Sequence, residues 1–434
     1  MTTIKAAPRA KGILVFLMLL NILNMVDRNL IASFGPRIIE DLQLTDAQFG
    51  LLTGLVFVFF YAIMGLFMGA LADRVHRPRL IAAGLILWSV LTAVSGAAKN
   101  FLQIGVSRLF IGVGESAMTP ASMSIISDIF PQSQRGTASG LYYLGVPLGA
   151  GGSFIVAGIL GPMIGWRNCF YLMGGLGVVL AVGLLLMRDP VRGAMEPPSL
   201  APAAPPIAPV GLRNTVRDLW AVIRANPALA WTMIGAILLH IPIGAGNFVM
   251  VWMERERGFA PGEMATLYGL IYIVCGTAGT FLGGILSDWY QARWPGGRIR
   301  FLAIMMVIIA PLTIGYRFAD PSSPFFYIGL ATALFSVSSF YGPAFSTVQD
   351  ITPVRLRGLM TGLLLVACNL FGLGLGALMI GFISDLLFAA QVAEPLTKSL
   401  LVGDFFGIFT APAFFVASYY LQRRVREQAS EVAA

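Results

Sequence analysis

The chain has 434 residues, of which 57% are hydrophobic and only 12% are charged. A soluble domain carries about 25% charged residues, so this composition excludes a water-facing globular protein and is typical of an integral membrane protein. The formal net charge of +8 does not indicate nucleic-acid binding, because the basic residues lie at the ends of apolar segments and form no patch interleaved with aromatic residues.

The N-terminal apolar segment follows three basic residues, Lys5, Arg9 and Lys11. This order is similar to that of a secretory signal peptide, but no small-residue cleavage site follows. The apolar segment instead continues through Asp27 and Arg28. The sequence therefore predicts an uncleaved first transmembrane helix that carries two charged residues in its interior.

Apolar stretches long enough to cross a bilayer recur along the whole chain. About 20 apolar residues are needed for one helical crossing, and charges, Pro and Gly mark the breaks between stretches. The chain divides in this way into six segments, a polar interruption and six further segments. The predicted spans are 12–34, 47–70, 79–97, 101–127, 137–160, 167–187, 228–251, 263–287, 300–317, 325–347, 358–384 and 401–421.

A proline-rich segment separates the two groups of spans. Prolines recur between Asp189 and Pro209, which predicts an extended linker, and Leu212–Ile223 has the pattern of a short amphipathic helix. We expect an all-α membrane protein with three parts. These are an N-terminal six-helix bundle over residues 1–188, a cytoplasmic linker over 189–227, and a C-terminal six-helix bundle with a cytoplasmic tail over 228–434.

The distribution of basic residues predicts the orientation of the protein in the membrane. Most of the 29 Lys and Arg residues fall on the face that holds both termini and the linker. Loops rich in Lys and Arg face the cytoplasm. Both termini and the linker are therefore expected to be cytoplasmic, in the cell (inner) membrane of a prokaryotic-type cell.

Two short motifs recur in the same order in both halves of the chain. The segment Gly69–Asp73 returns as Gly284–Asp288, and Asp128–Pro131 returns as Asp350–Pro353, at nearly the same offset. Such repeats predict a duplicated half. In a membrane protein, two parallel halves are the architecture of transporters whose bundles move about a central binding site.

Four ionisable residues lie inside the predicted spans of the first half: Asp27, Arg28, Arg108 and Glu115. A charge within the bilayer costs roughly 2.5–3.5 kcal/mol on insertion scales, so such residues are usually functional. Arg108 and Glu115 are spaced to share one helix face, whereas Asp27 and Arg28 point about 100° apart. We predict that Asp27 and Glu115 carry protons with Arg108 as their partner, and that Arg108 or Arg28 pairs with an anionic substrate group. Static ion pairs between helices are the alternative.

The spans of the second half offer polar rather than charged side chains in their interiors. His240 is a candidate proton relay, although a lone His in a helix is more often a packing residue. Together with the first-half residues, the side chains expected to contact substrate are Arg28, Arg108, Asn24, His240, Asn247, Tyr341 and Asn369. A site that is charged on one wall and apolar and aromatic on the other suits an amphiphile with an anionic or zwitterionic head and a long tail.

The motif at the end of the second predicted span carries a family resemblance. Gly69-x-Leu71-Ala72-Asp73-Arg74-x-x-Arg77-x-Arg79, together with the glycine-rich fifth and eleventh spans, resembles the major facilitator superfamily over the whole chain. His76 stands where that family usually has Gly. The resemblance implies two pseudo-symmetric six-helix bundles and transport by alternating access.

Three further elements narrow the resemblance to the spinster family. They are Asn21–Arg28 in span 1, Gly112–Ser116 in span 4, and Tyr142-Tyr143-x-Gly145-x-Pro147-x-Gly149 in span 5. That family is linked to the export of lysophospholipids and lipids similar to sphingosine-1-phosphate. The Asn-x-x-Asp-Arg element also occurs in anion:cation symporters of sugar phosphates and organic acids, so it does not distinguish the two groups alone.

The resemblance also implies a cytoplasmic gate at the repeated motifs. Asp73 with Arg77 and Arg135, and Asp288 with Arg357, are expected to hold the two halves together when the cytoplasmic side is closed. Ordinary capping of helix ends is the alternative interpretation of these residues.

The sequence therefore predicts a proton-coupled secondary transporter of a lipid-like amphiphile, and the family resemblance implies a monomer. It predicts no enzyme, because only two His occur and no metal-ligand spacing, nucleophile–base set or phosphate-binding loop is found. No cofactor or metal is expected, and the proton gradient is the energy source. A proton-coupled symporter of small organic anions or sugar phosphates, and a membrane sensor that binds without transport, remain the alternatives.

Overall fold

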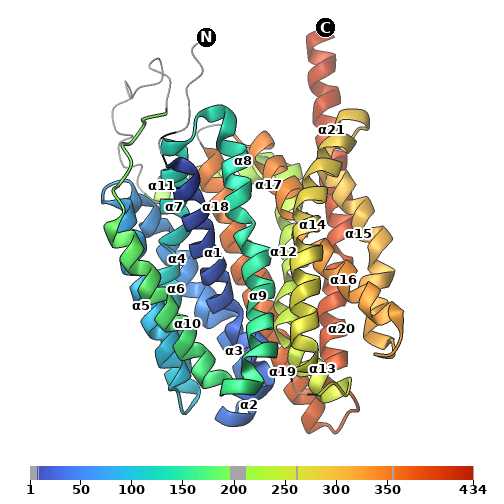
Figure 1. Ribbon diagram of the computed structural model, residues 1–434. Coiled ribbons are helices and arrows are strands. Elements are labelled where there is room, and N and C mark those ends of the chain that lie inside the picture. The colour runs from blue at the N-terminus through green and yellow to red at the C-terminus, as the bar shows by residue number, and fades with distance from the viewer. Residues whose placement is uncertain (1–6, 8, 196–211, 261, 354–355, 434) are drawn as a thin grey trace. The chain divides into compact units, whose positions relative to one another are not determined.

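A computed structural model of the protein describes residues 7, 9–195, 212–260, 262–353 and 356–433, and its regular secondary structure is helical (Figure 1). Twelve helical segments are long and apolar enough to cross a membrane, which confirms the all-α fold and the predicted number of spans. These segments are Ala10–Ser33, Asp46–Ala72, Arg77–Gly96, Phe101–Ile129, Gln132–Ile159, Gly161–Leu186, Pro227–Glu256, Glu263–Arg293, Gly297–Phe318, Pro324–Ile351, Arg357–Ala389 and Pro395–Arg424.

Several of these segments consist of two or three helices joined end to end. A membrane has no water to satisfy free backbone groups, so a short break is tolerated only where neighbouring helices pack against it. The helices are α1 (Ala10–Ser33), α2 (Gly35–Leu42), α3 (Asp46–Thr53), α4 (Leu55–Ala72), α5 (Arg77–Gly96), α6 (Phe101–Glu115), α7 (Met118–Ile129), α8 (Gln132–Tyr143), α9 (Gly145–Ile159), α10 (Gly161–Leu186), α11 (Leu212–Ala225), α12 (Pro227–Ala245), η2 (Gly246–Phe248), α13 (Val249–Glu256), α14 (Glu263–Arg293), α15 (Gly297–Gly315), η3 (Tyr316–Phe318), α16 (Pro324–Ser339), α17 (Tyr341–Ile351), α18 (Arg357–Ala367), a π-helix (Cys368–Gly374), α19 (Leu375–Ala389), α20 (Pro395–Ile408) and α21 (Thr410–Ala433).

Polar side chains set the starts of several helices. The hydroxyl of Thr45 accepts the Gln48 N–H while the Gln48 side chain accepts the Thr45 N–H, so a capping box begins α3. The side chain of Asn100 accepts the N–H of Gln103 at 3.0 Å and begins α6. The short α2, which contains Pro at its first turn, was not predicted from the sequence.

The chain forms two compact units by its internal contacts. The first unit comprises the first half without residues 45–54, and it includes Ala260–Ile273 from the start of α14. The second unit holds residues 45–54 and the rest of the second half. The division into bundles at residues 188 and 228 stays a prediction.

Close helix packing in the first unit depends on glycine. A side chain at Gly84 on α5 would meet the carbonyl oxygen of Gly114 on α6, and one at Gly114 would meet the carbonyl of Gly84. The lack of side chains therefore lets the two backbones approach. In the same unit α1 packs along α9 (Figure 1), and the rings of Phe154 on α9 and Tyr268 on α14 lie 4.6 Å apart.

In the second unit, α12 packs against α20, α21 and the π-helix, and α3 packs against α19. The Asp385 carboxylate accepts the N–H groups of Asp46 and Ala47 at 2.9 Å each, which stabilises the N-terminus of α3. Asp46 in turn pairs with Arg255 at 2.8 Å and accepts the Ser384 hydroxyl at 2.7 Å. These contacts fix α3 to the second unit.

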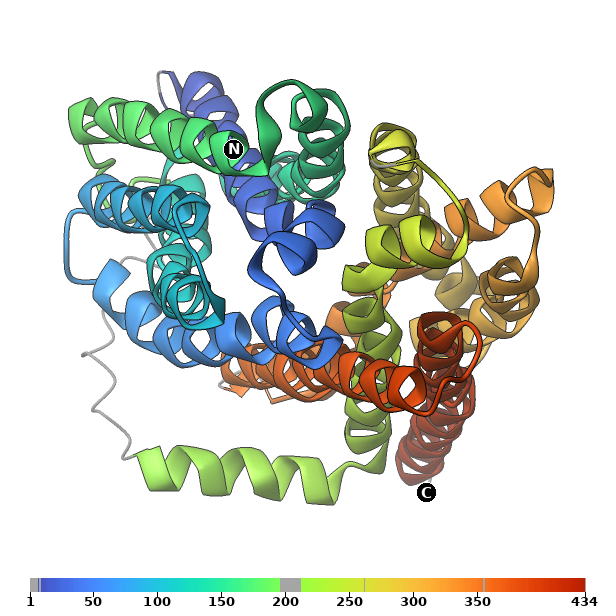
Figure 2. The same cartoon turned by 90° about the horizontal axis from the view of Figure 1, so that it is seen from below.

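The predicted amphipathic helix at Leu212–Ile223 is confirmed as α11, which extends two residues further, to Ala225. It precedes α12 and lies across the direction of the α12 axis (light green in Figure 2). The prolines of the predicted linker beyond Pro190 lie outside the described residues.

Candidate functional site

The central contact of the first unit is an ion pair between α1 and α6. Arg28 donates from Nε at 3.0 Å and from Nη2 at 2.8 Å to the same carboxylate oxygen, Oε2, of Glu115. The Glu115 side chain is fully buried, whereas 25% of the Arg28 side chain is exposed. The pair therefore joins a fully buried carboxylate to an arginine side chain that is partly exposed.

Arg108 is not the direct ion-pair partner that the sequence predicted for the carboxylates. Its Nη2 donates to the backbone carbonyl of Arg28 at 2.9 Å, and its guanidinium lies 4.7 Å from the centre of the Phe57 ring. Arg108 and Glu115 do share a face of α6, but Arg108 reaches the backbone of α1 while Glu115 reaches the Arg28 side chain. Arg108 thus holds the segment of α1 that carries the ion pair.

Asp27 points away from Arg28, as expected for adjacent helical residues, and contacts α5. The indole Nε1 of Trp88 donates to Asp27 Oδ2 at 3.1 Å, and both residues are buried. Sequence reasoning missed Trp88, because a Trp within an apolar span is usually a packing residue. No local signal distinguished it, since its partner lies 61 positions earlier in the chain.

Aromatic rings of α4 lie against the guanidinium group of Arg28. Its guanidinium lies 4.9 Å from the centre of the Phe57 ring and 4.5 Å from that of Tyr61. Such cation–π contacts contribute about 0.5–2 kcal/mol and stabilise a guanidinium group that has only partial solvation. They also stabilise the Arg28 cation when its carboxylate partner no longer carries a charge.

Several polar atoms of the site have no hydrogen-bond partner among the described residues. They include Oδ1 of Asp27, Oε1 of Glu115, Nε of Arg108 and Nδ2 of Asn24. An unpartnered buried polar atom costs about 1–3 kcal/mol, and such atoms are rare without a functional reason. Each of the two carboxylates therefore keeps one oxygen that can accept a proton.

The predicted substrate residues of the second half make hydrogen bonds within their own unit. The His240 ring contacts the Ala236 carbonyl at 2.7 Å through Nδ1 and the Tyr341 hydroxyl at 3.3 Å through Nε2. Asn247 donates to the Thr53 carbonyl at 3.5 Å, and Asn369 donates within its own helix at 2.8 Å. Their roles toward a substrate stay predictions.

The predicted gate residue Arg77 belongs to a buried network rather than to a pair with Asp73. It pairs with Asp128, donates to Asp189 Oδ1 at 2.8 Å and donates to the Pro190 carbonyl at 2.6 Å. Asp73 is exposed, and within the described residues no hydrogen bond or ion pair is found for it. The network ties the start of α5 to α7 and to the segment that follows α10.

The repeated motif of the second half forms a similar but more exposed arrangement. Arg298 donates to Asp288 at 2.5 Å and to Asp350 at 2.7 Å, whereas the sequence expected Arg357 as the partner of Asp288. Arg357 instead donates to the carbonyl five residues before it at 3.3 Å, and Arg135 makes the same contact in the first half at 3.2 Å. Gate contacts between the halves stay a prediction for all of these residues.

The comparisons with known proteins agree on one family. The model of the Major Facilitator Superfamily matches residues 17–377. A protein described as an MFS-type efflux pump from Mycolicibacterium smegmatis is 26% identical over 395 residues, which cover 91% of this chain and 89% of that protein. Protein spinster homolog 3 of Danio rerio is 25% identical, over 93% of this chain and 84% of that protein.

The fold is also similar to that of a solved structure. A bacterial homologue of the human lysosomal transporter spinster, in an inward-facing and unoccupied conformation, is 26% identical in sequence. It superposes with a TM-score of 0.83 and covers 96% of this chain and 98% of that chain.

Proposed function

Since the chain belongs to the major facilitator superfamily and is a secondary transporter of the spinster type, we propose that it carries a lipid-like anion by alternating access coupled to protons. The M. smegmatis relative is described as an efflux pump and the bacterial homologue as related to a lysosomal transporter. We further propose that its termini lie in the cytoplasm, as the Lys and Arg distribution predicts, and that it acts as a monomer, as the family resemblance implies.

The pair Arg28–Glu115 carries the proposal of proton coupling. Asp27 and Glu115 supply two negative charges when ionised, and Arg28 and Arg108 supply two positive charges, so the buried set is neutral. An anionic head group that binds Arg28 adds one negative charge to a region of low dielectric constant. Uptake of one proton by a carboxylate of the set restores neutrality, so anion binding and proton binding favour each other.

Arg28 acts as the switch in this proposal. While Glu115 is ionised, its Oε2 accepts two hydrogen bonds from Arg28. Protonation of Glu115 removes the charge that holds the guanidinium, which then binds the phosphate or carboxylate of the substrate. One proton supplies about 1.4 kcal/mol per pH unit, and one charge supplies about 2.3 kcal/mol per 100 mV of membrane potential.

The second unit supports an amphipathic substrate over a hydrophilic one. His240, Asn247 and Asn369 already bond within the unit, so they leave few polar groups for a sugar or a small acid. The buried Arg317 is paired with Asp404 at 3.0 Å, with 6% and 10% of the two side chains exposed. An apolar tail needs no such partners, because its burial is favourable at about 25 cal/mol per Å².

The experiment that tests this function is substrate-driven proton flux in proteoliposomes that contain a pH-sensitive dye. A lysophospholipid, a sphingoid phosphate and a sugar phosphate are added in turn to the wild-type protein and to Glu115→Gln. We expect a pH change with at least one of the two lipids, none with the sugar phosphate, and none with Glu115→Gln. Asp41→Asn is the matched control, because Asp41 is a partly exposed carboxylate paired with Arg167 outside the site.

The other outcomes separate the alternatives. A response to the sugar phosphate alone assigns the protein to the carriers of small organic anions and removes the lipid proposal. Binding of a lipid without flux identifies a sensor. Full proton flux in Glu115→Gln, with Asp41→Asn unchanged, contradicts the role of Glu115 and leaves the fold and family unaffected.

A further inference from the structure

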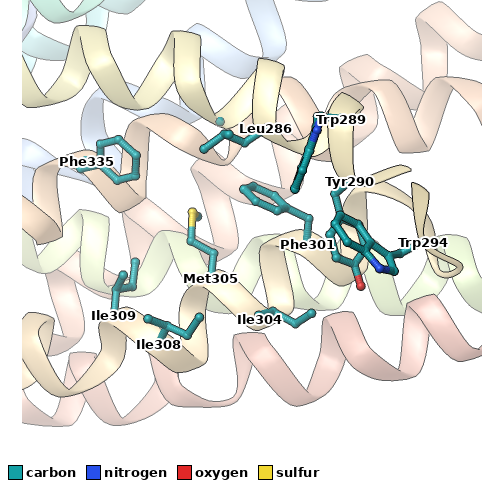
Figure 3. Close-up of a pocket in the computed structure, with 11 residues that line it drawn as sticks. Leu286, Trp289, Tyr290, Trp294, Phe301, Ile304, Met305, Ile308, Ile309 and Phe335 are labelled. Atoms are coloured by element: carbon teal, nitrogen blue, oxygen red, sulfur yellow. The ribbon is translucent and has the colours of Figure 1, made fainter. Parts of the chain in front are cut away.

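A groove of about 430 Å³ lies in the second unit between α14, α15 and α16 (Figure 3). Its lining side chains are apolar or aromatic, and they include Leu286, Met305, Ile308 and Phe335. Leu286 is 40% exposed and Ile308 is 68% exposed. The groove therefore opens on an apolar surface of two membrane-spanning helices. An apolar surface on membrane-spanning helices is suited to contact with the hydrocarbon of a bilayer, so the groove matches a lipid acyl chain in chemistry.

One end of the groove carries an aromatic cluster. Trp289 and Trp294 lie with ring centres 4.8 Å apart, and Tyr290 lies 5.2 Å from Trp294 and 6.1 Å from Phe301. These residues stand where α14 ends and α15 begins. Trp and Tyr concentrate at the boundary between hydrocarbon and head groups. The groove therefore runs from the head-group region into the hydrocarbon layer, on the side that the Lys and Arg distribution predicts to be cytoplasmic.

The same end carries positive charge that no carboxylate neutralises. Arg293 lies over the Trp289 ring at 4.8 Å and donates to the Trp289 carbonyl at 3.4 Å, and Arg300 donates to the Pro295 carbonyl at 3.5 Å. Neither has an acidic partner in the described part of the chain, whereas Arg298 between them pairs with two Asp residues. Arg293 thus lies against the aromatic end of the groove, and Arg300 lies by Pro295 and Gly296 in the turn that follows Trp294.

We propose that this groove binds one anionic phospholipid of the inner leaflet. One acyl chain lies between α14 and α15, and the phosphate lies beside Arg293 and Arg300. Guanidinium groups bind phosphate oxygens in a bidentate manner. The phosphate of a zwitterionic lipid binds them less well, because the ammonium group of the same lipid competes for it. The identity of the transported substrate does not enter here, since the residues that line the groove belong to the second unit and Arg28 and Glu115 belong to the first.

The two tryptophans that line the groove provide the test. The full-length protein is reconstituted into phosphatidylcholine nanodiscs that contain either brominated phosphatidylglycerol or brominated phosphatidylcholine with the same acyl chains. Bromine quenches tryptophan fluorescence on contact. The signal of Trp289 and Trp294 is obtained by subtracting that of Trp289→Phe/Trp294→Phe, because the chain has seven Trp in all.

We expect phosphatidylglycerol to quench these two tryptophans at a lower mole fraction than phosphatidylcholine. Each Arg near a membrane surface contributes about fivefold in affinity for anionic lipid, so the two together predict a preference of roughly 5- to 25-fold. Arg293→Gln/Arg300→Gln should abolish this preference. Arg424→Gln/Arg426→Gln, which removes the same charge from α21, should preserve it, and Ile309→Phe should reduce quenching by filling the groove.

Three results would overturn the proposal. Equal quenching by the two lipids identifies ordinary boundary lipid with no specific site. An unchanged preference in Arg293→Gln/Arg300→Gln, with Ile309→Phe also without effect, places the bound lipid elsewhere. Displacement of brominated phosphatidylglycerol by micromolar lysophospholipid identifies the groove as a site for a transported amphiphile rather than for a bilayer lipid.

Discussion

The two halves of the molecule place their buried charges in different ways. In the first half, Arg28 in the last third of α1 meets Glu115 at the end of α6. One oxygen of this carboxylate has no hydrogen-bond partner, and 25% of the Arg28 side chain is exposed. In the second half, Arg317 and Asp404 meet where α15 ends, and both are almost fully buried. At the offset that relates Asp128 to Asp350, the position of Glu115 holds Val337.

This difference separates a switching ion pair from a structural one. The guanidinium group of Arg317 is enclosed by Trp252 at 5.1 Å and Tyr316 at 4.8 Å, and its carboxylate partner is 10% exposed. Such a pair can stabilise a bundle but offers no open position for a substrate. The first pair keeps an unpartnered carboxylate oxygen and an arginine side chain that is 25% exposed, and these features suit the exchange of a proton and an anion.

The largest effect is expected from breaking these two pairs in parallel. Arg28→Gln and Arg317→Gln each leave a buried carboxylate without its counter-charge, which costs about 3–5 kcal/mol in the free energy of unfolding. Thermal unfolding in detergent measures the loss of stability in both variants. Only Arg28→Gln should also abolish anion-driven proton flux.

A second substitution sharpens this comparison. Glu115→Gln added to Arg28→Gln removes the orphaned carboxylate and should recover most of the lost stability without recovering flux. Recovery of flux in the double variant would show that the Arg28–Glu115 pair is structural, as we infer for Arg317–Asp404.

The repeated motifs give the next effect in size. Arg77 is fully buried within its network, whereas Arg298 contacts two carboxylates that are 64% and 60% exposed. Exposed pairs contribute about 0–1 kcal/mol and are screened by salt, while a buried charged network contributes several times more. We therefore expect Arg77→Gln to lower the free energy of unfolding by about 3 kcal/mol and Arg298→Gln by less than about 1 kcal/mol.

Salt is the control for that comparison. The free energy of unfolding is measured in detergent at low and at high ionic strength. High ionic strength should narrow the difference in this free energy between wild type and Arg298→Gln, but not the difference between wild type and Arg77→Gln. Equal losses in the two variants would indicate that the repeats are energetically equivalent in spite of their different burial.

The sequence predicted the twelve spans and the residues that form the site better than it predicted their contacts. Hydropathy and the repeats depend on local order along the chain, so they indicate the fold and place Asp27, Arg28, Arg108 and Glu115 within one unit. Helix periodicity determines which residues share a face of one helix. It does not determine how α6 is rotated against α1, and this rotation makes Arg28 rather than Arg108 the partner of Glu115.

Contacts that depend on a single distant side chain were beyond sequence reasoning. Trp88 was missed because its residue type is common in any apolar span. Arg77 was paired with Asp73 because the two are close in the motif. Arg77 is the first residue of α5, and its side chain contacts α7 and Asp189 instead. In both cases the deciding information is the packing of helices that are far apart in the chain.

A smaller effect is expected at Trp88, and the chain supplies its own control. Trp88→Phe keeps an aromatic side chain but removes the indole N–H that stabilises the ionised carboxylate of Asp27. A hydrogen bond to a charged group contributes about 1.5–3 kcal/mol. Without it the ionised carboxylate is less stable, so the midpoint of the pH–flux profile should move to higher pH.

Trp166→Phe is the matched variant, because Trp166 donates to Asp41 at 2.9 Å in the same kind of bond outside the site. It should leave the pH–flux profile in place. A displacement of equal size in both variants would assign the effect to general loosening of the bundle.

The smallest effect is expected in the second unit, at the contact between His240 and Tyr341. The hydroxyl lies 3.3 Å from Nε2, which is long for a hydrogen bond, and the His240 ring keeps its shorter contact with Ala236 when the hydroxyl is removed. Tyr341→Phe should therefore cost only about 0.5–1 kcal/mol of stability, change flux by less than about fivefold and leave its pH dependence unchanged. Because 39% of Tyr341 is exposed, any change should affect the substrate concentration at half-maximal flux rather than proton coupling. A displaced pH profile in Tyr341→Phe would place part of the proton path in the second half, and the contrast between a charged, switching half and a neutral, supporting half would then no longer hold.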